Sequence, residues 1–152
     1  MSVVIEKMTE ADLEAVLDID VAAFREPREV REKSLREELA RAWARLFVAR
    51  AEGGRVVGYL LYWHVVDEAH VINVAVAPQE RQRGIGRALV DRLLTEAKAT
   101  GIVKLLLEVR RSNVAAIRLY ESAGFTEFNV RERYYRDGED AVEMMLTREG
   151  AP

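Results

Sequence analysis

Residues 71–87 read Val-Ile-Asn-Val-Ala-Val-Ala-Pro-Gln-Glu-Arg-Gln-Arg-Gly-Ile-Gly-Arg, and this stretch decides the fold. The nearly continuous apolar run at 71–76 predicts a strand that is buried on both faces and ends before Pro78. After a loop rich in arginine and glycine, the apolar residues recur at helical spacing over about 84–100. The change from strand to helix predicts a protein of the α/β type.

Working outward, short apolar runs predict further strands, and charged segments with a helical period predict further helices. The segment 28–42 has only a thin apolar stripe, so we expect an exposed helix that lies over another element. The order β-α-α-β-β-β-α-β-α-β-β predicts a mixed, mostly antiparallel sheet of six to seven strands with helices on both faces. The other expected strands are 3–5, 46–49, 56–66, 103–109, 127–133 and 141–146, and the other expected helices are 9–20 and 113–122.

The composition is that of an ordinary soluble protein, with 49% hydrophobic and 32% charged residues. A length of 152 residues predicts one domain over 1–152. The net charge of −3 gives no general attraction to nucleic acid or to an anionic membrane, so we expect neither as a partner. The start of the chain has no secretory signal and no segment is long enough to span a membrane, so we expect a cytoplasmic protein of undetermined oligomeric state.

The types of residue present exclude several kinds of site. The absence of cysteine excludes disulfides, thiolate metal sites and a cysteine nucleophile. A histidine-rich metal site is not expected either, because His64 and His70 are the only histidines. Both lie in predicted strands, where we expect structural roles.

The loop at 82–87 has the chemistry of a phosphate site. The first turn of a helix offers unpaired N–H groups and a partial positive charge, glycines allow close approach, and arginines add donors. The same glycines also suit an ordinary tight connection between a strand and a helix. The third glycine of a dinucleotide site is missing, as is the Gly-Lys-Ser/Thr of a P-loop.

Three motifs together resemble the GCN5-related N-acetyltransferase (GNAT) family. They are Arg81-x-x-Gly84-x-Gly86, the run Leu105-Leu-Leu-Glu-Val-Arg-Arg-Ser-Asn113, and Ala116-Ile-Arg-Leu-Tyr-Glu-Ser-Ala-Gly-Phe125. Within the family the chain is similar to the RimI branch, which acetylates the N-terminal alanine of a ribosomal protein. The resemblance covers about residues 66–146. It implies the GNAT fold, acetyl-CoA as co-substrate without a metal, and acetyl transfer to a protein N-terminus or another primary amine.

The resemblance also implies roles for particular residues. Glu108 matches the general base, and Tyr120 matches the general acid that protonates the departing thiolate. The positions that match the acetyl-CoA site are Val74, Ala75, Val76, Gln82, Arg83, Gly84, Ile85, Gly86, Arg87 and Asn113. The residues expected at the acceptor are Phe24, Tyr134 and Tyr135.

These roles suit the chemistry. An amine attacks only when it is neutral, and an α-amine with a pKa of about 7.7–8.0 is neutral far more often than a lysine with a pKa of about 10.4. A carboxylate such as Glu108 can take the remaining proton, through a water, and we expect its place late in a buried strand to desolvate it. A backbone N–H of the preceding strand would stabilise the charge on the tetrahedral intermediate.

Other interpretations of the same residues stay open. Glu108 also suits a solvated carboxylate paired with Arg110, Tyr120 a core aromatic, and Tyr134 with Tyr135 a pair that stiffens a hairpin. Asn113 is in any case a good helix N-cap.

The acceptor is also open. The RimI branch tends to carry an aromatic-proline stretch after its first helix, but here charged residues separate Phe24 from Pro27. A lysine or small-molecule amine acetyltransferase therefore remains an alternative on the same scaffold. A non-catalytic acyl-CoA-binding domain is a further alternative, which the presence of both Glu108 and Tyr120 disfavours.

Overall fold

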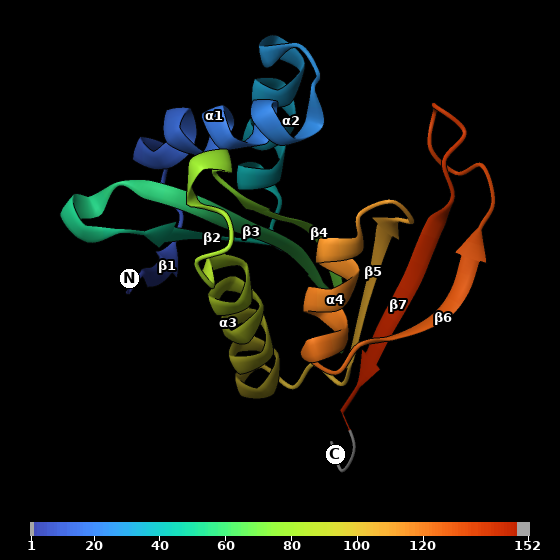
Figure 1. The fold of residues 1–152 in the computed structure, drawn as a ribbon. Helices are drawn as coiled ribbons and strands as arrows, with labels where there is room; N and C mark the ends of the chain where they lie inside the picture. The colour runs from blue at the N-terminus through green and yellow to red at the C-terminus, as the bar shows by residue number, and fades with distance from the viewer. Residues whose placement is uncertain (1, 149–152) are drawn as a thin grey trace.

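A computed structural model describes residues 2–148, in which seven strands form one sheet with the order β1-β2-β3-β4-β5-β7-β6 (Figure 1). All neighbouring strands are antiparallel except β4 and β5, which are parallel. The predicted fold class and the predicted order of helices and strands are confirmed. The strands are β1 (Val4–Lys7), β2 (Ala44–Arg50), β3 (Val56–Val65), β4 (Glu68–Val76), β5 (Lys104–Arg110), β6 (Thr126–Arg131) and β7 (Ala141–Thr147). The helices are α1 (Leu13–Phe24), α2 (Arg28–Ala40), α3 (Ile85–Ala99) and α4 (Val114–Ser122).

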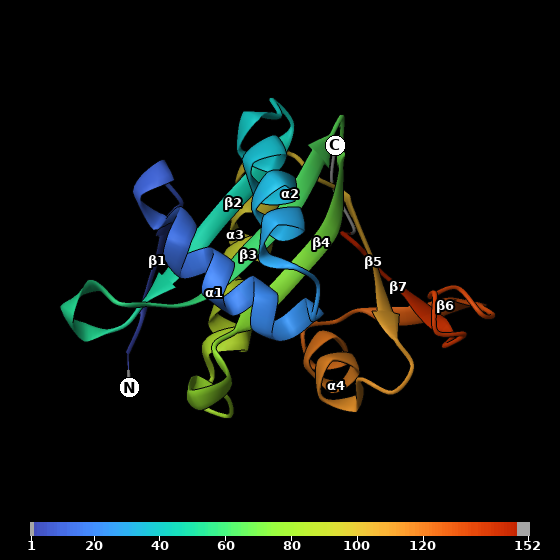
Figure 2. The same ribbon diagram turned by 90° about the horizontal axis from the view of Figure 1, so that it is seen from above.

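The two faces of the sheet are covered differently. Helices α3 and α4 lie on one face and bury the larger core, which draws on strands from β2 to β7. Helices α1 and α2 lie on the other face but cover only the half that ends at β4 (Figure 2). On that side, the face of β5, β7 and β6 carries no helix within residues 2–148. None of the helices in this range is long and apolar enough to cross a membrane.

Local sequence explains how α1 and α2 sit together. The backbone N–H of Thr9 donates to the Asp12 carboxylate at 3.0 Å, which completes a capping box ahead of α1. Helix α2 is exposed along most of its length, as its charge pattern predicts, and buries Leu35 against the sheet. Arg28 holds the two helices together from outside, because its guanidinium binds Glu14 at 2.7 Å and Asp18 at 2.8 Å.

Strand β4 is not buried on both faces along its whole length, so that prediction was wrong for its second half. It pairs with β5 only from Glu68 to Val71, and then the two strands separate (Figure 2). Ile72 is the extra residue of a bulge against β3 and is 38% exposed. Val74 and Val76 are only half-buried, because β5 no longer runs beside them.

Candidate active site

The separation of β4 from β5 leaves an open strand edge at the place where the sequence predicts the thioester to bind. Beyond Val71, β4 remains paired with β3 on one side, and no described strand pairs with its other edge. The predicted binding segment Val74–Val76 lies on this edge. A free strand edge presents backbone N–H and C=O groups, so it can pair with an extended chain that contains amides.

The loop before α3 has a backbone that could cradle an anion. Gln82 and Gly84 have left-handed backbones, with φ of +64° and +80°, and Gly84 caps α3. From Arg81 to Arg87, no backbone N–H donates a hydrogen bond to another described residue. A Cβ placed on Gly84 would meet nothing within 4 Å, so the approach to these amides is open. Free amides, a helix N-terminus and an open approach are what a phosphate needs.

The loop arginines are held at the margins of this cradle. Arg83 pairs at 3.0 Å with Glu80, a buried carboxylate that Arg55 also binds. Arg87 pairs with Asp91 at 2.9 Å and donates to the Ser122 hydroxyl of α4 at 2.8 Å. Both guanidiniums remain about half exposed, so each can still face an anion.

The second glycine of the loop has a packing role. A Cβ on Gly86 would lie 3.3 Å from a Leu119 methyl group, so this glycine lets α3 approach α4 closely. Asn113 caps α4, because its side-chain oxygen accepts from the Ala116 N–H at 3.2 Å. The Asn113 amide group keeps its two N–H donors for another partner.

Tyr120 projects from α4 into an apolar environment. It is 7% exposed and packs edge-to-face on Phe125 with 5.6 Å between the ring centres. Burial raises the pKa of Tyr120 to about 12. Its hydroxyl donates to no other residue of the described chain, so it is available as a donor and keeps its proton at neutral pH.

Glu108 lies on β5 just beyond the last residue that pairs with β4, on the edge of the same opening. Its side chain is exposed, so the expected desolvation at the end of a buried strand was wrong. Side chains alternate along β5, and Leu107 and Val109 point into the core under α3 and α4. Glu108 therefore points to the face that no helix covers. The alternative pairing with Arg110 is not found, since Arg110 binds Asp137 at 2.9 Å and Glu139 at 3.0 Å.

The segment between β6 and β7 brings a tyrosine to Glu108. The Glu108 carboxylate raises the pKa of Tyr134, first through hydrogen bonding to its hydroxyl and then through its negative charge. Tyr135 stacks edge-to-face on Tyr134 at 5.2 Å, and the Arg110 guanidinium lies 4.1 Å from the Tyr135 ring centre. The two predicted acceptor tyrosines thus lie beside the predicted base.

Three further polar residues surround Glu108 that sequence reasoning missed. Glu143 lies directly opposite Glu108 across β5 and β7. It accepts from Asn129 at 2.7 Å and pairs with Arg131 at 3.1 Å, and these donors lower the pKa of Glu143. Only the pairing register of three strands places these residues together, and no spacing along the chain reveals that register.

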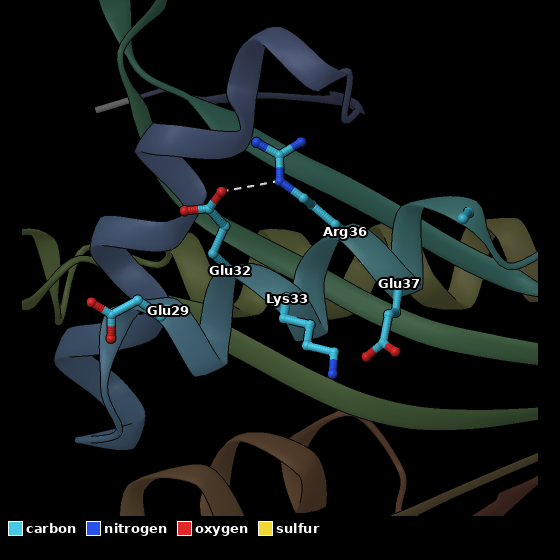
Figure 3. A pocket seen from close by; sticks show the side chains of 6 residues that line it. Glu29, Glu32, Lys33, Arg36 and Glu37 are labelled. Atoms are coloured by element: carbon cyan, nitrogen blue, oxygen red, sulfur yellow. Dashed lines mark hydrogen bonds and ion pairs between the residues drawn. The ribbon is translucent and has the colours of Figure 1, made fainter.

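Phe24, the third predicted acceptor residue, lies on the half of the sheet that α1 and α2 cover. It ends α1, is 41% exposed, and its ring centre lies 4.8 Å from the Arg31 guanidinium. A shallow hollow along the outer face of α2 is lined by charged residues such as Glu29, Lys33 and Glu37 (Figure 3). None of the predicted site residues lines it, so we interpret it as the solvated face of this helix.

Comparisons with known proteins show the family of the chain and confirm its fold. The profile of the Acetyltransferase (GNAT) family matches residues 13–125. The [Ribosomal protein bS18]-alanine N-acetyltransferase of Escherichia coli strain K12 is 45% identical over 98 residues, which are 62% of this chain and 66% of that protein. The chain thus matches just under two thirds of that relative's length. A putative enzyme of the same name from Bacillus subtilis strain 168 is 31% identical over 94% of both chains. The crystal structure of the E. coli ribosomal-protein-S18-alanine N-acetyltransferase has a TM-score of 0.88 and 35% identity, and covers 99% of this chain and 97% of that one.

Proposed function

The chain belongs to the GNAT acetyltransferase family, and from this membership we propose that it moves the acetyl group of acetyl-CoA directly to the N-terminal α-amine of a protein, with residues 1–152 acting as one domain. One observation carries the proposal: the free edge of β4 and the exposed carboxylate of Glu108 lie on the two sides of one opening. A donor bound along β4 would place its thioester next to a base that an amine can reach.

Two features support the proposed binding of acetyl-CoA. The free amides from Arg81 to Arg87 suit the pyrophosphate, with Arg83 and Arg87 beside it. The pantetheine arm contains amides, so it suits the unpaired edge at Val74–Val76. Asn113 still has free N–H donors at the start of α4 and is a further candidate contact.

In the proposed reaction, the neutral amine attacks the thioester carbonyl and its proton passes to Glu108, directly or through a water. A free N–H of β4 stabilises the negative oxygen of the tetrahedral intermediate. The C–S bond then breaks, the amide remains on the acceptor, and CoA leaves as a thiolate. The thiolate takes up a proton from water and Glu108 releases its proton to water, so the reaction yields the amide and free CoA. No covalent intermediate with the protein forms.

Tyr120 serves the leaving sulfur as a hydrogen-bond donor. An ordinary thiol has a pKa of about 8.5, while burial raises the pKa of Tyr120 to about 12. Full transfer of the tyrosine proton to a free thiolate would thus be uphill. A hydrogen bond that strengthens as charge develops on sulfur avoids this cost.

The acceptor proposal rests on the environment of Glu108. Tyr134 and Tyr135 flank the carboxylate on a side that no described helix covers, so a chain terminus can approach. The named relatives act on an N-terminal alanine of a ribosomal protein. The separation of Phe24 from Pro27 favours a second candidate, a lysine or small amine, because it alters the segment expected beside the acceptor.

Intact-mass detection of acetyl transfer tests the proposal and separates the candidates. One peptide begins with a free Ala-Arg and lacks lysine, and the other is blocked at its N-terminus and carries one internal lysine. Acetylation of the first alone supports the proposal. Acetylation of the second alone assigns the enzyme to lysine. If neither reacts while acetyl-CoA binds, small amines are the next acceptors to test. A protein that neither binds acetyl-CoA nor transfers acetyl groups would contradict the proposal.

A further inference from the structure

A hydrogen-bonded network of four polar side chains, two of them fully buried, joins α1, α2, β3 and β4. The Tyr59 hydroxyl donates to the Asp20 carboxylate at 2.6 Å and accepts from the Asn73 amide group at 3.2 Å. Arg31 donates twice to Asp20, at 2.5 and 3.0 Å. Asp20 and Tyr59 are both fully buried. A charge in the interior is costly unless it is paired and hydrogen-bonded, so the buried Asp20 carboxylate favours keeping its bonds to Arg31 and Tyr59.

One end of this network, Asn73, lies on the acetyl-CoA side of the proposed site. Asn73 stands between the bulged Ile72 and the binding segment Val74–Val76, in the part of β4 that β5 no longer accompanies. With a neighbour on one edge only, this segment has fewer hydrogen bonds to fix its position. The bond from Asn73 to Tyr59 adds one anchor at the start of that segment.

The other end of this network lies where α1 ends and the connection to α2 begins. The guanidinium of Arg31 is 4.8 Å from the centre of the Phe24 ring and 3.8 Å from the Glu26 carboxylate. Arg31 therefore contacts both the predicted acceptor residue Phe24, which ends α1, and Glu26 in the connection to α2. The same guanidinium is anchored to the interior through Asp20.

We propose that Tyr59 is a positioning residue. Through Asp20 and Arg31 on one side and Asn73 on the other, it sets the position of the α1–α2 connection relative to the free edge of β4. The inference rests on the proposed function. Reacting atoms must lie about 3–3.5 Å apart, so a small shift lowers the rate of transfer. The phosphate cradle before α3 is separate from this network, and the backbone edge of Val74–Val76 remains when the network is broken, so we expect the affinity for acetyl-CoA to change less than the rate of transfer.

The test compares Tyr59→Phe with Tyr62→Phe. Each variant removes one hydroxyl from a buried tyrosine of β3, but Tyr62 points into the other core and donates to no described residue. Kinetics with acetyl-CoA and the Ala-Arg peptide are measured well below the unfolding temperature of every variant. We expect Tyr59→Phe to lower kcat about tenfold, with both KM values within twofold of wild type. Tyr62→Phe should leave all three constants within twofold.

Asn73→Ala removes the hydrogen bond between Asn73 and Tyr59 from its other side. It should lower kcat in the same direction, and the double variant with Tyr59→Phe should be no slower than the slower single variant, because both break one connection.

The inference is overturned if Tyr59→Phe keeps kcat within twofold, if Tyr62→Phe slows the enzyme equally, if the change is confined to a KM, or if the two substitutions act additively. A wild-type protein that acetylates no amine overturns the proposed function and this inference with it. An active wild type with any of the four preceding results overturns the inference alone.

Discussion

On the face of the sheet against which α1 and α2 pack, one half has buried polar side chains and the other half has exposed ones. Under these helices, in the half from β1 to β4, Asp20 and Tyr59 are fully buried and satisfied by neighbouring side chains. In the half made of β5, β7 and β6, no described helix covers the face (Figure 2). Glu108 on β5 is exposed there. One half thus holds a hydrogen-bonded network of polar side chains, while the other presents a carboxylate that a substrate can reach. The boundary between them is the line where β4 and β5 separate.

The largest expected effect is on the exposed half. Glu108→Gln should lower kcat about 10²–10⁴-fold, because the amide cannot accept the amine's proton, and should leave KM for acetyl-CoA nearly unchanged. Steady-state kinetics with both substrates varied measure this. Glu127→Gln is the matched control, since Glu127 lies opposite the core residue Met144 and so faces the other side. A large loss of acetyl-CoA affinity in Glu108→Gln would show a structural role instead.

At the boundary, Gly84→Val should show the reverse pattern. Its φ of +80° strains a β-branched residue, and the side chain would fill the open approach to the free amides, so KM for acetyl-CoA should rise about 10–100-fold. Gly53→Val is the control, because Gly53 has a φ of +83° and equally open surroundings in the turn after β2. Equal effects of both substitutions on KM would mean that strain, and not phosphate access, is responsible.

Tyr120→Phe should lower kcat about tenfold by removing a donor to the leaving sulfur, with little effect on acetyl-CoA binding. Because burial raises the pKa of Tyr120 to about 12, the hydroxyl keeps its proton as the pH rises past its usual value of about 10. The wild-type rate should therefore show no decline from Tyr120 ionisation between pH 8 and 10. A pH–rate profile of kcat measures this, and a decline near pH 10 that vanishes in Tyr120→Phe would contradict it.

The smallest effect is expected from a substitution of Glu143, which lies opposite Glu108 on the uncovered half of the sheet. Glu143→Gln keeps a side chain opposite Glu108 but removes the charge that pairs with Arg131. We expect KM for the peptide to rise about two- to fivefold and kcat to change little, because this residue shapes the surroundings of the base without taking the proton. Peptide-dependence curves at saturating acetyl-CoA check this. A fall in kcat as large as that of Glu108→Gln would assign Glu143 a direct part in proton removal.

Sequence reasoning succeeded where the signal lies within a few residues. The change of period after Pro78 predicted β4 and α3, and Asn113 and Gly124 bracket the predicted α4. These signals depend on side-chain periodicity and turn chemistry, which act over one or two turns of chain. The motifs around Glu108 and Tyr120 likewise indicated the family, which the comparisons confirm.

The features that the sequence predicted wrongly or missed depend on pairing between strands that are far apart in the sequence. The burial of Glu108 and of all of β4 was predicted wrongly, because an apolar run does not say where a neighbouring strand leaves it. Arg131 and Glu143 meet Glu108 only through the register of β5, β7 and β6.

By itself, then, the sequence determined the order of elements, the phosphate-type loop and the family, because each is written in contiguous residues. Only the tertiary structure decided that β4 and β5 separate, that Glu108 is exposed opposite Glu143, and that Tyr59 links Asp20 to Asn73. The physical reason is that these contacts join residues from 14 to 39 positions apart, such as Tyr59 with Asn73 and with Asp20. Their geometry is set by how whole helices and strands pack, which no local pattern encodes.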